Sequence, residues 1–136
     1  MKSKKYILLL VVIVLSTAAS AKSLKTNRVY LFGFSASFKD SVVYVTDIQN
    51  PQGVWIESKN KFLLNRDEYS YQLNNYLSEK LQLPQRVCMV LFAFNKKKAE
   101  KLYLKLMKKY KKGYEIRYLN VTDFKFETID LTPEEE

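Results

Sequence analysis

The sequence predicts an α+β domain in which two helices pack on one face of a mixed, mostly antiparallel sheet of about five strands. Apolar residues recur at helical spacing in two segments, alternate with polar residues in several others, and run without interruption in only one. A three-layer α/β arrangement is the alternative, because a β-α-β-α-β order also permits parallel, right-handed crossovers.

The N-terminal half of this domain predicts an antiparallel hairpin. Residues 22–27 look like a short frayed leader, whereas residues 29–38 alternate as a half-buried strand does. Residues 39–40 break the alternation before a β-branched run over 41–48, which predicts the second strand. A two-residue loop would pair Phe34 with Val45 and give a core face made of Phe34, Phe38, Val43 and Val45.

The middle of the chain predicts a short strand followed by a helix. Residues 54–56 form the strand, after turn residues. Asn65 or Asp67 can cap a helix that runs to about Leu83, where Pro84 stops it. Its apolar side contains Tyr69, Leu73, Tyr76, Leu77 and Leu81.

The unbroken apolar run over residues 87–94 predicts the central strand, covered on both faces. Asn95 can cap a second helix over 96–112, which ends at Gly113. Both helices are expected on the same face of the sheet. Two further alternating segments, 114–118 and 124–128, predict strands with one face toward solvent.

The two ends of the chain are expected to lie outside this single domain, which spans residues 22–131. Three lysines precede an apolar run over 6–15, and small residues follow it, so residues 1–21 predict a signal peptide cleaved after Ala21. An uncleaved anchor is the alternative, although the run is shorter than the roughly 20 residues of a spanning helix. Residues 132–136 predict a disordered acidic tail.

The composition excludes several kinds of chemistry. The 136 residues include no histidine, one cysteine and three glycines. Histidine triads, histidine-ligated zinc and an intrachain disulfide are therefore impossible, and we assign no catalytic, cofactor-binding or metal-binding residue. Cys88 lies in the apolar run, where we expect a raised thiol pKa. The carboxylates are scattered, and no pair has a spacing typical of acid–base catalysis.

The second predicted helix carries an unusual charge. Residues 96–112 contain nine lysines and one acid, a net charge of +8, whereas residues 22–136 together carry +6. The lysines lie opposite an apolar stripe, which predicts contact with an anionic partner; a merely solvated face is the alternative. Without interleaved aromatics or arginines, sequence-specific nucleic-acid binding is not expected. The candidate contact residues are Lys97, Lys98, Lys101, Lys105, Lys108, Lys109 and Lys112.

Two stretches, VYLFGFSASFKDS at 29–41 and YSYQL at 69–73, together with the N-terminal leader, carry a resemblance. In these residues the chain resembles a group of small uncharacterised exported proteins of Bacteroidales-type bacteria. The resemblance implies export to the periplasm or the exterior, and it implies no activity and no site residues. In that setting Asp40-Ser41-Val42 matches a short O-glycosylation pattern, which makes Ser41 a candidate modification site.

Together these features predict an exported, non-enzymatic binding or scaffolding domain of the cell envelope. We expect its partner to be an anionic envelope component or an acidic protein, and we expect no transmembrane span after signal cleavage. A carboxylate-based glycan-active enzyme is one alternative. A protein-interaction subunit that pairs its outer β-edge with a partner strand is the other.

Overall fold

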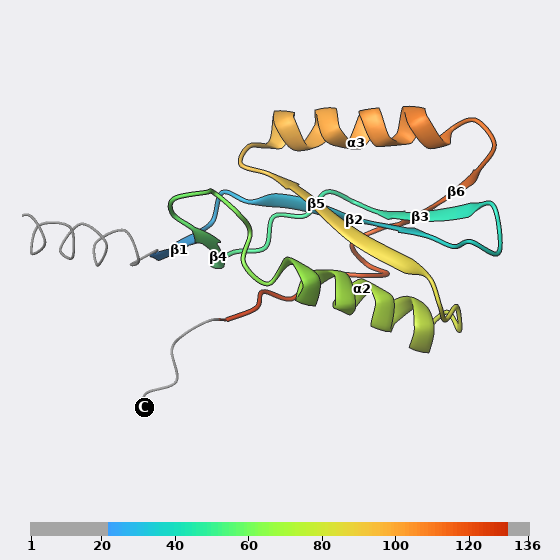
Figure 1. Cartoon of the computed structure of the whole chain (residues 1–136), viewed down its shortest axis with the longest axis horizontal. Coiled ribbons are helices and arrows are strands. Elements are labelled where there is room, and N and C mark those ends of the chain that lie inside the picture. Colours follow the sequence, from blue (N-terminus) through green and yellow to red (C-terminus); the bar gives the residue numbers. More distant parts are fainter. Residues whose placement is uncertain (1–21, 131–136) are drawn as a thin grey trace, which may run out of the picture.

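The computed structural model describes residues 22–130 and shows an α+β fold with two helices and six strands in two sheets, which confirms the predicted fold class (Figure 1). The predicted signal peptide and acidic tail lie outside the described residues. The elements are β1 (Ser23–Thr26), β2 (Tyr30–Ala36), β3 (Val42–Thr46), β4 (Val54–Glu57), α2 (Arg66–Glu79), β5 (Val87–Ala93), α3 (Lys96–Tyr110) and β6 (Glu115–Leu119).

The main sheet has four strands in the order β5-β2-β3-β6. β2 is antiparallel to both of its neighbours, whereas β3 and β6 are parallel. It follows that β3, β5 and β6 all run in the same direction. The connections from β3 through α2 to β5, and from β5 through α3 to β6, are therefore parallel crossovers.

The two helices lie on opposite faces of this sheet, so the expectation that they share a face is wrong (Figure 1). The crossover through α2 moves across the sheet from β3 toward β5, and the crossover through α3 moves back from β5 to β6. Parallel crossovers are almost always right-handed, and two of the same hand that move in opposite directions must use opposite faces. The result is three layers: α3, the sheet and α2.

The apolar run over residues 87–94 forms an edge strand, which corrects its expected position at the centre of the sheet. Val87 and Met89 on β5 keep 54% and 41% of their surface exposed. The two inner strands are β2 and β3, and residues Leu31 to Ser35 of β2 are all buried. β2 includes Gly33 and Ser35, so its sequence alternates even though both of its faces are covered.

The hairpin between β2 and β3 has the predicted register but a longer loop. Phe34 pairs with Val45, as expected, and both side chains are buried with Val43. Phe38 was expected in the core, yet it is 97% exposed. The backbone N–H of Lys39 donates to Ser37 Oγ, a local turn that ends the strand before Phe38.

Residues 22–27 are not a frayed leader, because four of them form β1. β1 pairs antiparallel with β4, and Leu24 lies opposite Ile56 in this second, two-stranded sheet. The predicted strand over 54–56 is thereby confirmed as β4. The partner of a short strand is distant in sequence, so the composition of residues 22–27 alone could not identify it.

Both helices start at the predicted residues, but α2 ends at Glu79 and not at about Leu83. Leu81, expected on its apolar side, lies beyond the helix and is exposed, because the chain leaves the helix ahead of Pro84, with a left-handed backbone at Gln82 (φ 55°).

Asn65 is the N-cap of α2, although its backbone is left-handed and its side chain makes no capping hydrogen bond. At α3, Asn95 Oδ1 accepts a hydrogen bond from the backbone N–H of Lys98 at 2.8 Å, which confirms the cap. α3 ends at Tyr110, slightly earlier than expected, and Gly113 has the left-handed backbone (φ 89°) that follows many helices.

Residues 124–128 form no strand, contrary to expectation, although the alternating burial of Phe124 and Phe126 is as predicted. Two glutamine side chains take the place of a neighbouring strand. Gln49 donates to the Phe124 carbonyl at 2.9 Å and accepts from the Phe126 N–H at 2.8 Å. Gln72 makes the same pair of bonds to the backbone of Glu127.

Candidate functional site

The lysines of α3 form a continuous exposed face, because the opposite side of the helix is held against the sheet. Ala99 and Met107 are buried there. Tyr103 packs against Phe32 with ring centroids 5.3 Å apart, and Tyr110 packs against Phe34 at 4.7 Å. All seven lysines predicted to contact an anion are exposed on the remaining surface, and Lys112 lies just beyond the helix end.

Two ion pairs among residues 22–130 lie away from this face. They join Arg86 to Asp40 and Arg117 to Glu115. The single acid in the basic segment, Glu100, lies on the flank of α3 that faces β3, where it lines a hollow with Tyr103 and Leu104. The charged residues on the outward surface of α3 are therefore all positive, although Leu104 also projects from this surface and is 65% exposed.

The hollow beside Glu100 brings two carboxylates together that the sequence left apart. Asp47, which follows β3, lines the same hollow, whose volume is about 530 Å³. Burial raises the pKa of the neighbouring Tyr103 hydroxyl. Both carboxylate residues are exposed, and Asp47 Oδ2 accepts a hydrogen bond from the backbone N–H of Val121 at 3.1 Å. Paired carboxylates that catalyse glycan cleavage lie in a cleft that encloses the substrate, whereas both of these residues are exposed.

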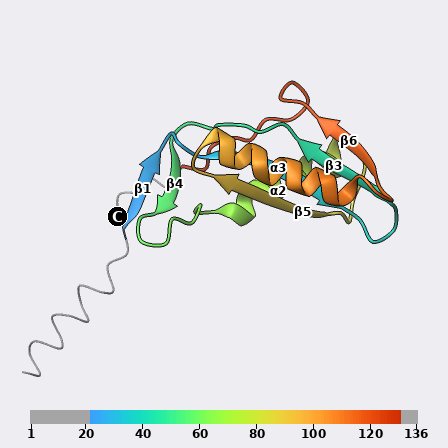
Figure 2. The same ribbon diagram turned by 90° about the horizontal axis from the view of Figure 1, so that it is seen from above.

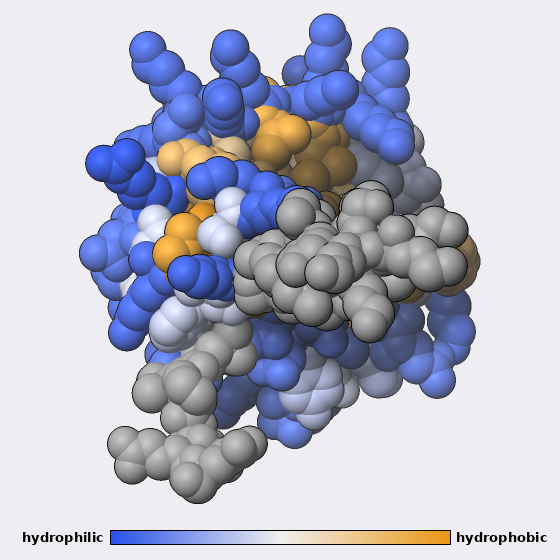
Figure 3. Space-filling view, turned by 60° about the vertical axis from the view of Figure 1, so that its left-hand side comes forward, coloured by the Kyte–Doolittle hydropathy of each residue, from blue (hydrophilic) through white to orange (hydrophobic). Residues whose placement is uncertain are grey.

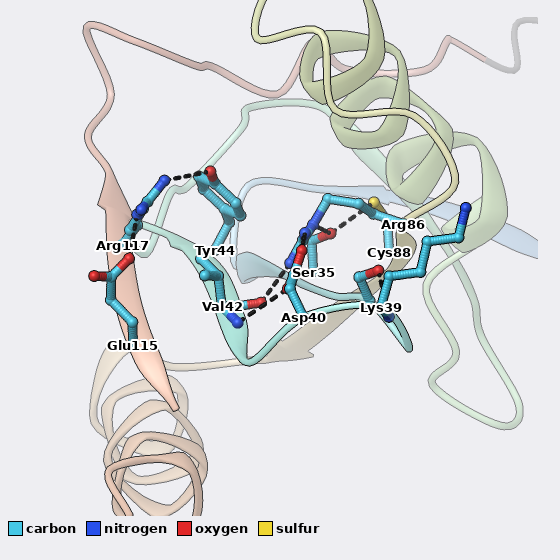
Figure 4. Close-up of polar contacts among 10 residues, drawn as sticks. Ser35, Lys39, Asp40, Val42, Tyr44, Arg86, Cys88, Glu115 and Arg117 are labelled. Atoms are coloured by element: carbon cyan, nitrogen blue, oxygen red, sulfur yellow. Dashed lines mark hydrogen bonds and ion pairs between the residues drawn. The ribbon is translucent and has the colours of Figure 1, made fainter. Parts of the chain in front are cut away.

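A second cluster of polar groups, not identified from the sequence, surrounds Arg86 on the α2 face of the sheet (Figure 4). The Arg86 side chain is only 3% exposed and pairs with Asp40 at 3.1 Å. It also donates to Ser35 Oγ at 3.2 Å and to the carbonyl of Val42. Its guanidinium lies 4.9 Å from the ring centre of Tyr44. Because every side of the guanidinium is occupied, this cluster joins the hairpin loop to the start of β5.

The groups around Arg86 have little reactivity of their own. The Cys88 thiol donates a long bond, 3.5 Å, to Ser35 Oγ, and burial raises its pKa as expected. The pKa of Asp40 is lowered, first because its carboxylate accepts the backbone N–H of Val42 and then because Arg86 is close. No sequence signal distinguishes Arg86 from the other arginines, because its partners lie 44 to 51 positions away.

Ser41, the candidate modification site, lies in the turn before β3 and is exposed. Its backbone carbonyl accepts a hydrogen bond from the N–H of Glu115 at 2.8 Å, which fixes the turn against β6. The neighbouring Asp40 is directed toward Arg86 and Val42 (Figure 4). The turn therefore presents Ser41 on a rigid support.

Two general features of residues 22–130 bear on the kind of site. No cluster of three metal-binding side chains of the types Cys, Asp and Glu is found among them. None of the helices in this part of the chain is both long and apolar enough to cross a membrane. Comparison with known proteins gives no relative, since no family model, curated protein or solved structure matches the chain.

Proposed function

We propose that the chain is an exported, non-enzymatic binding or scaffolding domain of the cell envelope that contacts an anionic partner through the lysines of α3. The observation that carries this proposal is the segregation of charge. Residues 96–112, which comprise α3 and the two lysines that follow it, hold a net charge of +8, and all of their lysines are exposed. An anionic envelope component is the favoured partner, and an acidic protein is the alternative.

The lysine face has an energetic cost that a partner would offset. Lys97, Lys101, Lys105 and Lys109 follow one another at i,i+4 spacing, and each like-charge pair at that spacing destabilises a helix by a few tenths of a kcal/mol. At an anionic surface, in contrast, each lysine contributes about 1 kcal/mol of binding free energy. The apolar stripe anchors α3 without the lysines, so the charged face is free for binding.

We expect the protein that begins at Lys22 to bind anionic vesicles or an acidic polysaccharide at low salt. Binding should weaken steeply as salt rises, because the screening length falls to about 8 Å at physiological ionic strength. Changing Lys101, Lys105, Lys108 and Lys112 to glutamate should abolish binding. The glutamine versions should weaken it by roughly 10³-fold, at about 1 kcal/mol per lysine. Co-sedimentation across a salt series measures both effects.

All four positions are exposed, so circular dichroism of the variants should match that of the wild type. A panel of several anionic vesicles and polysaccharides serves as the control for selectivity. Binding of equal strength to every polyanion would contradict the proposal, because any basic protein shows that behaviour.

The export part of the proposal has a separate test. Protein recovered from the periplasm or the culture medium should begin at Lys22 when its N-terminus is sequenced, since signal peptidase is expected to cut after Ala21. A full-length N-terminus found only in the membrane fraction would contradict export.

A second candidate function, strand addition at the edge of the sheet, is favoured by one observation. β5 is an edge strand without a charged residue, and exposed edges of this kind pair with partner strands. Arg66 weighs against it, because its Nε donates to the Val90 carbonyl at 2.7 Å and occupies the middle of the edge. Only the first residues of β5, before Val90, then have an open edge that a partner strand could pair with.

A further inference from the structure

A hollow lies between α3 and the end of β5, on the side where the sheet ends. Its floor is apolar and consists of Phe92, Ala93 and Phe94 together with Leu102 of α3. Its volume is about 440 Å³, within the range of small-molecule sites. Figure 3 shows this apolar surface directly below the row of hydrophilic side chains along the top of the molecule.

The hollow follows from the way in which α3 packs. Seen from above, α3 lies along the middle of the sheet, with β5 on one side and β3 and β6 on the other (Figure 2). Its apolar stripe packs against Phe32 and Phe34 of β2, and Leu91 of β5 joins the same cluster, so the hollow lies beyond Leu91, at the end of β5. Ala93 is too small to fill that space from below. The apolar floor is thus a consequence of an edge strand that extends beyond its covering helix.

Three lysines border the apolar floor. Lys98, Lys101 and Lys105 are spaced by three and four residues, so they lie in a row along one side of α3, and they line the hollow with Leu102. No acid is among its lining residues. The hollow therefore combines an apolar floor with a cationic rim on a single side.

We propose that this hollow binds a single-chain anionic amphiphile, such as a long-chain carboxylate. The hydrocarbon chain lies on the floor formed by Phe92, Phe94 and Leu102, and the headgroup lies among the ammonium groups of the rim. The proposal shares these lysines with the proposed function and rests on it for the choice of an anionic ligand. It goes further, because it names the ligand and adds an apolar site.

The geometry favours a single chain over the other occupants of an apolar groove. The backbone groups of Leu31 and Gly33 in β2 point toward β3, because Leu31 pairs with Gln49 and the Gly33 N–H donates to Thr46 Oγ1. The β5 residues opposite them therefore receive no backbone hydrogen bonds from β2. Cys88, Val90 and Phe92 direct their backbone groups to the open edge of β5 instead. Arg66 holds the Val90 carbonyl and lies 5.6 Å from the Phe92 ring centre, so a partner strand cannot pair along this end of the edge.

The test is calorimetric titration of the protein that begins at Lys22 with octanoate, decanoate and dodecanoate, all below their micelle concentrations. We expect the affinity to rise about fourfold for each methylene added until the floor is covered. Decyltrimethylammonium, which has the same chain length as decanoate but the opposite charge, should bind at least about tenfold more weakly.

Two matched pairs of variants locate the site. Leu102→Gln should weaken decanoate binding about tenfold, whereas Leu104→Gln, the same change on the other flank of α3, should leave it within twofold. The triple change of the rim lysines, Lys98, Lys101 and Lys105, to glutamine should remove the preference for the anion. The triple change of Lys97, Lys108 and Lys111 removes the same charge away from the hollow and should preserve that preference.

The proposal would be overturned by equal effects of Leu102→Gln and Leu104→Gln, by equal binding of the two opposite charges, or by no titration heat for any chain length. Vesicle binding separates this proposal from the proposed function. Decanoate binding without vesicle or polysaccharide binding would support the hollow and contradict the surface role of α3. Vesicle binding that is insensitive to Leu102→Gln, with no decanoate binding, would support the surface role of α3 and contradict the proposed ligand site in the hollow.

Discussion

Replacing Gly33 with valine is expected to lower the free energy of unfolding by about 3 kcal/mol, because no space exists for a side chain at that point of β2. An added Cβ would lie 2.7 Å from Leu73 Cδ2, 3.0 Å from Phe126 Cζ and 3.3 Å from Thr46 Cγ2. Leu73 and Phe126 are buried and cannot move aside without displacing α2 or the C-terminal segment. Gly33 thus permits the close approach of α2 to the sheet.

A double-mutant cycle with Leu73→Ala tests this explanation by urea denaturation. Leu73→Ala alone should destabilise by about 2–5 kcal/mol, because it leaves a cavity in the core. In the double variant, the methyl groups of valine would enter that cavity. The double variant should therefore be more stable than the sum of the two single effects predicts, by at least about 1 kcal/mol. Strict additivity would contradict the proposed contact between the two residues.

Those parts of the fold that depend on neighbouring residues were predictable from the sequence. The Asn95 cap, the glycine after α3 and the pairing of Phe34 with Val45 each follow from a pattern within about ten residues. The apolar stripes of both helices follow from helical periodicity in the same way. Each of these signals is local and acts before the tertiary fold is known.

The order of the strands could not be predicted in the same way. β5 has an unbroken apolar sequence because α2 covers one of its faces and α3 part of the other, although its edge lies open. β2 is buried on both faces but includes Gly33 and Ser35, one of which makes room for α2 while the other binds Arg86. The apolar character of a strand sequence reports the burial of its side chains, whereas an edge strand is defined by the absence of backbone pairing on one side. The sequence of β5 therefore did not reveal its position in the sheet.

Contacts between distant segments explain the remaining errors. The segment over 124–128 alternates as a strand does, but Gln49 and Gln72 satisfy its backbone, and no sequence rule identifies a glutamine as the partner of a remote segment. Likewise, β1 becomes a strand only because β4 lies beside it. In both cases the partner is at least 28 residues away along the chain.

The candidate site likewise has one part that was predictable from the sequence and two parts that were not. The lysine face of α3 was predictable, because charge and apolar residues separate along a single helix. The apolar hollow was not, because its floor joins Leu102 to the end of β5 only when α3 folds back over the sheet. The Arg86 cluster was not predictable either, since its four partners come from β2, the hairpin loop and β3.

Replacing Arg86 with methionine is expected to lower the free energy of unfolding by about 3 kcal/mol. Methionine retains the apolar stem but leaves the Val42 carbonyl without the Arg86 donor and Ser35 Oγ with only the long contact from the Cys88 thiol, and unsatisfied buried groups cost about 1–3 kcal/mol each. Arg86→Lys is the matched control for charge. It should be almost as unstable, because an ammonium group cannot reproduce the planar fork that reaches Ser35, Asp40 and Val42 together.

The acid partner of Arg86 gives the network a pH signature. The pKa of Asp40 is lower in the folded protein than its ordinary value near 4, through the Val42 N–H and Arg86. Its carboxylate therefore stabilises the fold fully above about pH 5, and this contribution is lost as the pH falls through the folded-state pKa. Asp40→Asn keeps an oxygen for the Val42 N–H but carries no charge. The difference in unfolding free energy between wild type and Asp40→Asn should be largest near pH 6 and shrink toward pH 2 in denaturation curves. A difference that stays constant over that interval would show that the charge pairing of Asp40 with Arg86 contributes nothing to the stability of the hairpin loop.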